Sequence, residues 1–250
     1  MPSVRYPKTL AAIAVITVLA VAFVATFDWN WVRAPLAHYL SGKFDRSFAI
    51  NGDLHGEFSL HPLLTGTDVV LANAAWGSAP ALARARQVAV RVDLLSFLHD
   101  SPSLPELTLS DATLALERDA QGRENWDFGD RSTTVQIGRL VVDAGAVQFH
   151  DLQRGIDLNA TVKSAAAGAD GQLTIRFDAK GIWEKNDLTM AGTATTPFAA
   201  NLDDRPYRLD IELHSGTTSG TFAGTFVPAH DKEIEGALAL KGQDLSQIDA

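Results

Sequence analysis

From Phe48 onward, apolar residues recur at every second position in short runs separated by polar or glycine-containing segments. The clearest run covers residues 87–94, where three valines and a leucine at even positions alternate with Gln, Ala, Arg and Asp at odd positions. Successive side chains of a strand point to opposite faces, so this alternation predicts half-buried β-strands. An Ala-rich segment at 79–86 suggests a short helical turn, but no long helical pattern follows residue 48. The sequence therefore predicts a mainly β domain over residues 48–250.

One predicted strand, at 107–117, changes the parity of its apolar positions. Its leucines occupy positions 107 and 109 before Ser110 and positions 114 and 116 after Asp111. A slip of one residue turns every later side chain to the other face of a sheet. We therefore expect a bulge or a tight turn at Ser110 and Asp111 that keeps the leucines on one face.

The same pattern returns 33 positions later, at 140–149, and an imperfect earlier copy covers 69–74. A repeat of this period is typical of architectures that stack similar units. In the last third of the chain, further alternating segments separated by turn residues predict an antiparallel meander.

Residues 10–27 form the one long apolar run, which has no charge, Gly or Pro. As a helix it would span roughly 27 Å, close to the hydrocarbon thickness of a bilayer. Arg5 and Lys8 precede it, and Trp29 and Trp31 follow it at the position of an interfacial belt. We expect a cytoplasmic tail at 1–9, a transmembrane anchor at 10–27 and an exported remainder. A cleaved signal peptide is the alternative, but the run exceeds a usual signal core and lacks a good small-residue cleavage site.

The segment 28–47 is expected to contain a short amphipathic helix, with Asn30 as its N-cap. Val32, Leu36, Tyr39 and Leu40 recur at helical spacing from Trp31 to residue 44. Two interpretations stay open at this point. The helix lies on the membrane surface or at one end of the domain, or it is an ordinary packed helix.

Charge and residue types exclude several classes of function. The net charge of −9 argues against nucleic acid and against broad adhesion to anionic lipid headgroups. The chain has no cysteine, its seven histidines show no metal-ligand spacing, and no nucleotide or nucleophile motif occurs. We therefore expect no enzyme, no metal and no cofactor.

An antiparallel sheet with one apolar face must cover that face. A second sheet would give a closed β-sandwich, whereas curling would leave a groove for an apolar guest. Glycines and bulges at repeated positions supply curvature. Physical argument alone favours the sandwich, because closed cores are the ordinary outcome.

The apolar run and six later segments resemble the N-terminal region of AsmA family proteins of Gram-negative envelopes. These segments are DWNWVRAPL (28–36), INGDL (50–54), VVLANAAW (69–76), VRVDLL (90–95), LALERD (114–119) and GRENWDF (122–128). The order and spacing of the segments, rather than any single one, carry the resemblance, which covers residues 5–130 well and the meander more loosely.

The resemblance implies a single-pass inner-membrane protein, with its N-terminus in the cytoplasm and its bulk in the periplasm. It also implies a curled antiparallel sheet, a β-groove related to that of bridge-like and chorein-type lipid transfer proteins, over residues 48–250. Such proteins are implicated in phospholipid transport and outer-membrane assembly. We expect acyl chains of phospholipid to bind an apolar face made by Val88, Val90, Val92, Leu94, Leu114, Leu116, Val147, Phe149, Leu209, Ile211, Phe222 and Leu238.

Two further expectations accompany this hypothesis. Family members are usually much longer, and residues 244–250 resemble the start of another element, so we expect a C-terminally truncated groove that cannot bridge the periplasm alone. The alternative function is a scaffold for outer-membrane proteins, with a closed sandwich core and an exposed strand edge that docks other envelope proteins.

Overall fold

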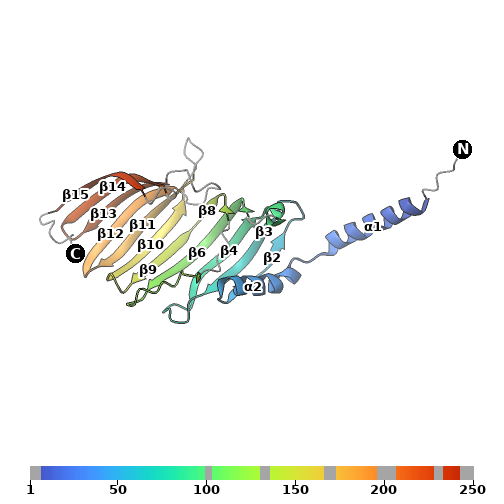
Figure 1. Ribbon diagram of the computed structural model, residues 1–250, viewed down its shortest axis with the longest axis horizontal. Helices are drawn as coiled ribbons and strands as arrows, with labels where there is room; N and C mark the ends of the chain where they lie inside the picture. Colours follow the sequence, from blue (N-terminus) through green and yellow to red (C-terminus); the bar gives the residue numbers. More distant parts are fainter. Residues whose placement is uncertain are drawn as a thin grey trace.

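The structure, a computed structural model, describes residues 7–98, 103–129, 136–165, 173–195, 207–227 and 233–242. Two helices precede a long sheet whose strands follow one another along the molecule (Figure 1). The elements are α1 (Pro7–Thr26), α2 (Asn30–Phe44), β1 (Phe48–Ile50), β2 (Leu54–Gly56), β3 (Leu63–Ala72), β4 (Ala81–Arg91), the 3-10 helix η1 (Leu94–Leu98), β5 (Ser103–Leu104), β6 (Glu106–Arg118), β7 (Gln136–Ile137), β8 (Leu140–Val142), β9 (Gly145–Asp151), β10 (Ile156–Ser164), β11 (Thr174–Trp183), β12 (Asn186–Thr195), β13 (Tyr207–Ser215), β14 (Thr218–Val227) and β15 (Glu233–Lys241).

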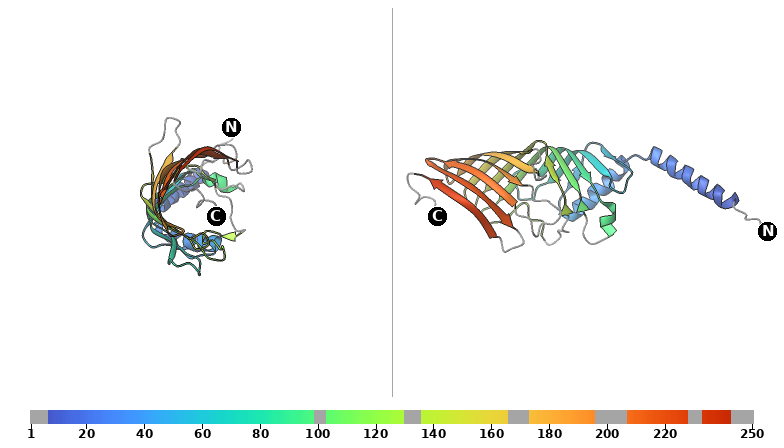
Figure 2. Two further views of the ribbon diagram at one scale, coloured as in Figure 1. Left: turned by 90° about the vertical axis from the view of Figure 1, so that its left-hand side faces the viewer. Right: turned by 90° about the horizontal axis from the view of Figure 1, so that it is seen from above.

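Thirteen strands form one sheet, in the order β1-β3-β4-β6-β9-β10-β11-β12-β13-β14-β15, with β2 beside β3 and β8 beside β6. Its two ends do not pair with each other, and the end-on view of Figure 2 shows an open, curled sheet. Only the two-stranded pair β5-β7 lies outside this sheet among the described residues. The mainly β, curled architecture implied by the resemblance is confirmed, and the closed sandwich favoured by physical argument is wrong.

The sheet is antiparallel except at one step. β6 runs parallel to both β8 and β9, with Leu107 paired to Leu140 and Leu114 to Val147. The expectation of a fully antiparallel sheet is therefore wrong at this step. From β9 to β15 every neighbouring pair is antiparallel, which confirms the predicted meander.

The predicted parity change lies at Asp111, whose φ is +47°. Asp68 on β3 has a φ of +46° and lies in the same cross-strand row, since the flanking residues of β3, β4 and β6 are in register. Arg86 of β4 lies between them and forms an ion pair with Asp111. The cross-strand row of Asp68, Arg86 and Asp111 thus keeps the apolar residues before it and after it on the same face of the sheet. A methyl group on Gly66, before the row, would lie 3.4 Å from the side chain of Val69, after it.

The 33-residue repeat is visible as strand register. Leu107 pairs with Leu140 and Leu114 pairs with Val147, so the second copy lies beside the first at an offset equal to the repeat period. The prediction for the earliest copy of the repeat, at residues 69–74, is displaced from the observed parity change. Its left-handed residue is Asp68, whereas Asn73 lies after the end of β3.

Residues 79–86 do not form the suggested helical turn, because β4 begins at Ala81. Ala83 pairs with Leu71 and Ala85 with Val69, and Ala85 is buried. Pairing with β3 therefore outweighs the helical preference of the alanines, as is common where a strand is held on both sides.

Helix α2 covers one end of the apolar face. Val32 and Leu36 pack against the buried side chains of Ile50, Leu54 and Val69, and Val88 joins this cluster. Tyr39, expected on the packed face, is 59% exposed. Asn30 does not cap the helix either. Its side-chain oxygen accepts a hydrogen bond from the backbone N–H of Leu54 at 2.9 Å, so it fixes the helix to β2 instead.

Helix α1 projects away from the sheet (Figure 1). Its described apolar side chains are exposed on all sides, with values from 49% at Val24 to 66% at Val18. Within the described residues no single helix meets the length and hydropathy criteria for a membrane span. Residues 11–26 and 30–44 meet them only together, as a pair bent by 75°.

The left-handed conformation at Asp111 predicts an asymmetric response to substitution. Asp111→Val should lower the free energy of unfolding by about 1–2 kcal/mol, because a β-branched residue is strained at positive φ. Asp111→Gly should change it by less than about 0.5 kcal/mol, since glycine adopts this conformation freely and the lost ion pair is exposed. Urea unfolding in detergent, followed by tryptophan fluorescence, measures both variants. Equal losses would contradict the conformational explanation.

Candidate functional site

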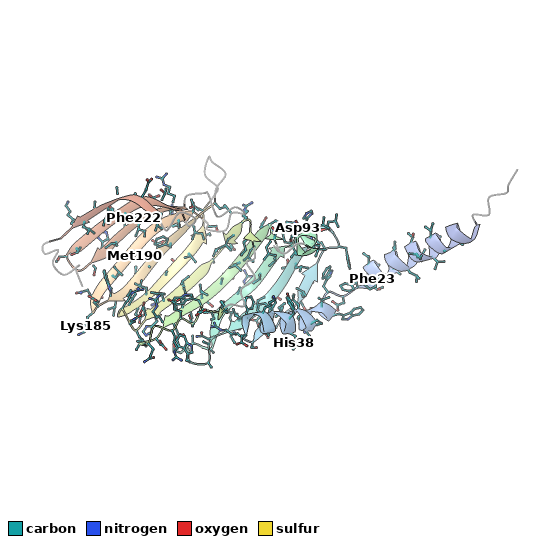
Figure 3. All side chains as sticks on the ribbon, in the orientation of Figure 1. Phe23, His38, Asp93, Lys185, Met190 and Phe222 are labelled. Atoms are coloured by element: carbon teal, nitrogen blue, oxygen red, sulfur yellow. The ribbon has the colours of Figure 1, made fainter. Side chains whose placement is uncertain are left out.

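The strand register places apolar residues in rows that cross the C-terminal half of the sheet. Directly paired residues of neighbouring strands share a face, so each row can be followed from strand to strand. One row consists of Gly145, Val162, Phe177, Gly192, Ile211, Phe222 and Leu238. The next consists of Val147, Ala160, Ala179, Met190, Leu213, Gly220 and Leu240. Figure 3 labels Met190 and Phe222 in this part of the sheet.

Glycines in these rows make room for aromatic rings. A methyl group on Gly192 would lie 2.8 Å from Cζ of Phe177, and one on Gly224 would lie 2.6 Å from Cζ of Phe222. The ring of Phe177 therefore lies over Gly192 of the neighbouring strand β12, and the ring of Phe222 lies over Gly224 of its own strand and beside Gly236 of β15. A cavity of about 600 Å³ touches Phe177, Gly192, Ile211 and Phe222, and it also touches their neighbours of opposite parity, among them the charged residues Arg176, Asp178, Asp210 and Glu212.

The apolar face is the concave one. Helix α2 packs on this face through Val32 and Leu36, and Figures 1 and 2 place α2 on the open side of the curl. Away from α2, the face has little protein cover. Leu238 is 62% exposed, and Leu240 and Trp183 are each 39% exposed. The chain thus forms an open trough lined by apolar side chains, which we call the groove.

Ten of the twelve residues expected to line an apolar face lie on strands and share the concave face: Val88, Val90, Leu114, Leu116, Val147, Phe149, Leu209, Ile211, Phe222 and Leu238. The other two lie beyond the end of β4. Val92 is buried, and Leu94 begins η1 with 48% of its surface exposed. Trp31 is 66% exposed, while Trp29 is half-buried. Arg5 lies outside the described residues, and only the backbone of Lys8 is described.

A buried polar network joins the loop after β6 to β6 and to the loop after β3. Asn125, in the loop after β6, is completely buried. Its side-chain amide donates to Asn73 Oδ1 at 2.9 Å and to the Ala115 carbonyl at 2.8 Å, and its side-chain oxygen accepts from the Glu117 backbone N–H at 2.9 Å. Every hydrogen-bonding group of this amide is used, which fixes the loop against β6.

Glu117 is the second centre of this network. Its carboxylate accepts hydrogen bonds from the Ser78 backbone N–H at 2.7 Å, the Asn73 amide at 2.9 Å and the Ala79 backbone N–H at 3.2 Å. Burial alone would raise the pKa of Glu117, but these donors to the ionised form outweigh it, and the pKa lies below its ordinary value.

The same loop holds the C-terminal end of α2. The Arg46 guanidinium donates to the Asn125 carbonyl and, at 3.2 Å, to the Asp127 carbonyl. It also lies 4.6 Å from the ring centre of Phe128, which packs on Phe44 of α2 at 5.5 Å. We call the loop 122–128, with its partners Asn73 and Arg46, the clip. It joins α2, β6 and the loop after β3.

The arrangement of apolar helix, open sheet and clip can be compared with known proteins. The AsmA family model matches residues 6–197. The chain belongs to the AsmA family. It is 21% identical to AsmA family protein YhjG of Escherichia coli (strain K12) over 253 residues, covering 85% of this chain and 37% of that protein. No solved structure matches the chain significantly.

The AsmA match runs from α1 to the end of β12 and includes the whole clip. Two of the segments that carry the resemblance, 69–76 and 122–128, contact each other through Asn73 and Asn125. Sequence reasoning identified both segments but missed that they form one structural unit. The sequence gives no clear signal of this contact, because Asn125 lies among the charged residues Arg123, Glu124 and Asp127.

The depressed pKa of Glu117 predicts an acid-sensitive clip. A carboxylate whose folded pKa lies below its unfolded value, 4.5, adds stability above that pH and loses it as the pH falls through the folded pKa. Glu117→Gln should therefore lower Tm at pH 7, and its deficit relative to wild type should shrink between about pH 5 and pH 3.

Thermal unfolding by circular dichroism at several pH values measures this difference. Glu106→Gln, on the same strand but outside the network, is the matched control and should keep the wild-type pH profile. A deficit for Glu117→Gln that stays constant down to pH 3 would show that ionisation of this carboxylate does not stabilise the clip.

Proposed function

We propose that this AsmA family protein is held in the inner membrane by α1 and binds acyl chains of phospholipid along its groove in the periplasm. It thereby contributes to phospholipid transport and outer-membrane biogenesis. The observation that carries the proposal is the row from Gly145 to Leu238, which continues across seven strands without an ionisable side chain. An acyl chain along this row would bury its methylenes while the headgroup stays in water.

The free energy of burying an acyl chain is consistent with reversible lipid binding. Each buried methylene contributes about 0.8 kcal/mol, so one acyl chain supplies enough free energy to hold a lipid on an open face and to release it. The proposed role is therefore binding and guidance without catalysis.

The character of α1 supports membrane anchoring. Its 20 residues would extend about 30 Å as a helix, and its exposed side chains are apolar on every side. A helix of this kind is costly in water and favourable in lipid. The basic residues Arg5 and Lys8, at the N-terminal end of the apolar run 10–27, favour a cytoplasmic N-terminus and so support a periplasmic sheet.

The chain spans about 37% of the length of YhjG. We therefore assign the groove described here to the membrane-proximal part of a transport route. Partner proteins or further groove segments would complete a route to the outer membrane.

Lipid binding can be tested with variants that introduce charge on opposite faces of the sheet. Met190 lies on the concave face, whereas the neighbouring Thr189 lies on the convex face and is exposed. The full chain is purified in mild detergent and its phospholipid content is measured by mass spectrometry. Combining Met190→Glu with Ile211→Glu should lower bound phospholipid at least about fivefold, because charges in the groove oppose apolar burial.

Thr189→Glu is the control and should keep the wild-type phospholipid content. Circular dichroism verifies that all variants remain folded. Wild-type protein free of phospholipid, or an equal loss in the convex-face control, would rule out the groove as the binding site.

The free edge of β15 favours a second candidate function, a scaffold that docks other envelope proteins. β15 pairs with β14, and no other strand in the described part of the chain covers its outer edge. An unpaired edge can accept a strand from a partner. A photo-crosslinker at Leu238 or Leu240 separates the functions: acyl adducts support lipid binding, and protein adducts support the scaffold.

A further inference from the structure

Exposed apolar side chains gather at the end of the sheet nearest α1. Phe58 and Leu60, in the loop 57–62 between β2 and β3, are 48% and 63% exposed. Leu94 and Leu95, at the start of η1, are 48% and 50% exposed. We call these four residues the collar. None of them belongs to the apolar rows of the C-terminal half of the groove.

Backbone hydrogen bonds join the two parts of the collar. The Leu94 N–H donates to the Leu60 carbonyl at 3.3 Å, and the Val92 N–H donates to the Pro62 carbonyl at 3.0 Å. The loop and η1 therefore form one continuous surface at the end of the sheet, and its four apolar side chains are exposed.

Aromatic contacts join the collar to the end of α1. The ring of Phe58 lies 5.3 Å from that of Phe27 and 5.1 Å from that of Trp29, measured between ring centres. Trp29 in turn lies over Gly56 of β2, where a methyl group would come within 2.6 Å of the indole. The collar thus begins where the apolar helix ends, so a bilayer that receives α1 meets the collar next.

The collar also extends from one rim of the groove to the other. In the end-on view of Figure 2, α2 and η1, the short green helix, lie at opposite rims of the open side. The loop 57–62 contacts Trp29 beside α2 and, through Leu60, the start of η1. The collar residues therefore surround the end of the groove.

We propose that the collar inserts into the interfacial layer of the same bilayer that holds α1, so that the end of the groove opens directly onto the lipid surface. This inference rests on the proposed membrane anchoring. The collar combines large apolar side chains with Glu57, His61, Arg91 and Asp93 nearby, a mixed set of charges rather than a basic patch. Insertion of apolar side chains, rather than attraction to anionic headgroups, provides the contact.

The absence of cysteine from the sequence allows a direct test. Leu60→Cys and Leu95→Cys are labelled singly with an environment-sensitive fluorophore, and the full chain is reconstituted in vesicles of phosphatidylethanolamine and phosphatidylglycerol. Phospholipids carrying a doxyl quencher near the headgroup should quench both collar labels at least about twofold more than a label at Thr189→Cys on the convex face. Quenching no stronger than at Thr189 would overturn the proposal.

A label at Met190→Cys distinguishes the collar from lipid binding in the groove. Quenched collar labels with an unquenched Met190 label would support the collar and count against lipid in the groove, and the reverse result would overturn the collar alone. Collar labels are also measured with Ile211→Glu present. If their quenching disappears in that background, it comes from lipid in the groove and the proposal fails.

Discussion

Strand register is the constraint on which the groove depends. The long strands of the sheet largely alternate apolar and polar side chains, and a shift of one residue between two of them would place apolar groups in water on the convex face. In β3, β4 and β6 the apolar positions change from odd to even or from even to odd at the row Asp68, Arg86 and Asp111. The positive φ of the two aspartates keeps the apolar side chains on the same face across this row. The apolar face therefore stays continuous along the molecule.

The clip and α2 define the N-terminal end of this face. Helix α2 covers Ile50, Leu54 and Val69, which form a cluster of buried apolar side chains. Asn125 and Glu117 hold the loop that binds the end of α2, with every buried polar side-chain atom in the described residues hydrogen-bonded. Elsewhere the face remains open, so the molecule combines a fixed, well-packed end with a long uncovered surface.

Alternation and parity predicted the mainly β architecture, the turn at Asp111 and the 33-residue offset, since these depend on local spacing, but they missed the first half of β4, where alanines suggested a helical turn. The choice between sandwich and groove needed the family resemblance, because the same alternation satisfies both. Contacts between distant segments were not predictable from periodicity. Asn30 binds β2 rather than capping its helix, and Asn125 and Asn73 meet across 52 positions of sequence. Each of these hydrogen bonds joins residues far apart in the sequence, so it depends on how the folded chain brings them together.

The central claim is that acyl chains lie on the concave face. Phospholipids with a photoreactive diazirine in the acyl chain, incorporated in the membrane that holds the full chain, test it most directly when adduct positions are mapped by mass spectrometry. The account predicts adducts on concave residues such as Met190, Ile211 and Phe222. Adducts confined to α1, or distributed equally over convex residues such as Thr189 and Thr193, would contradict it.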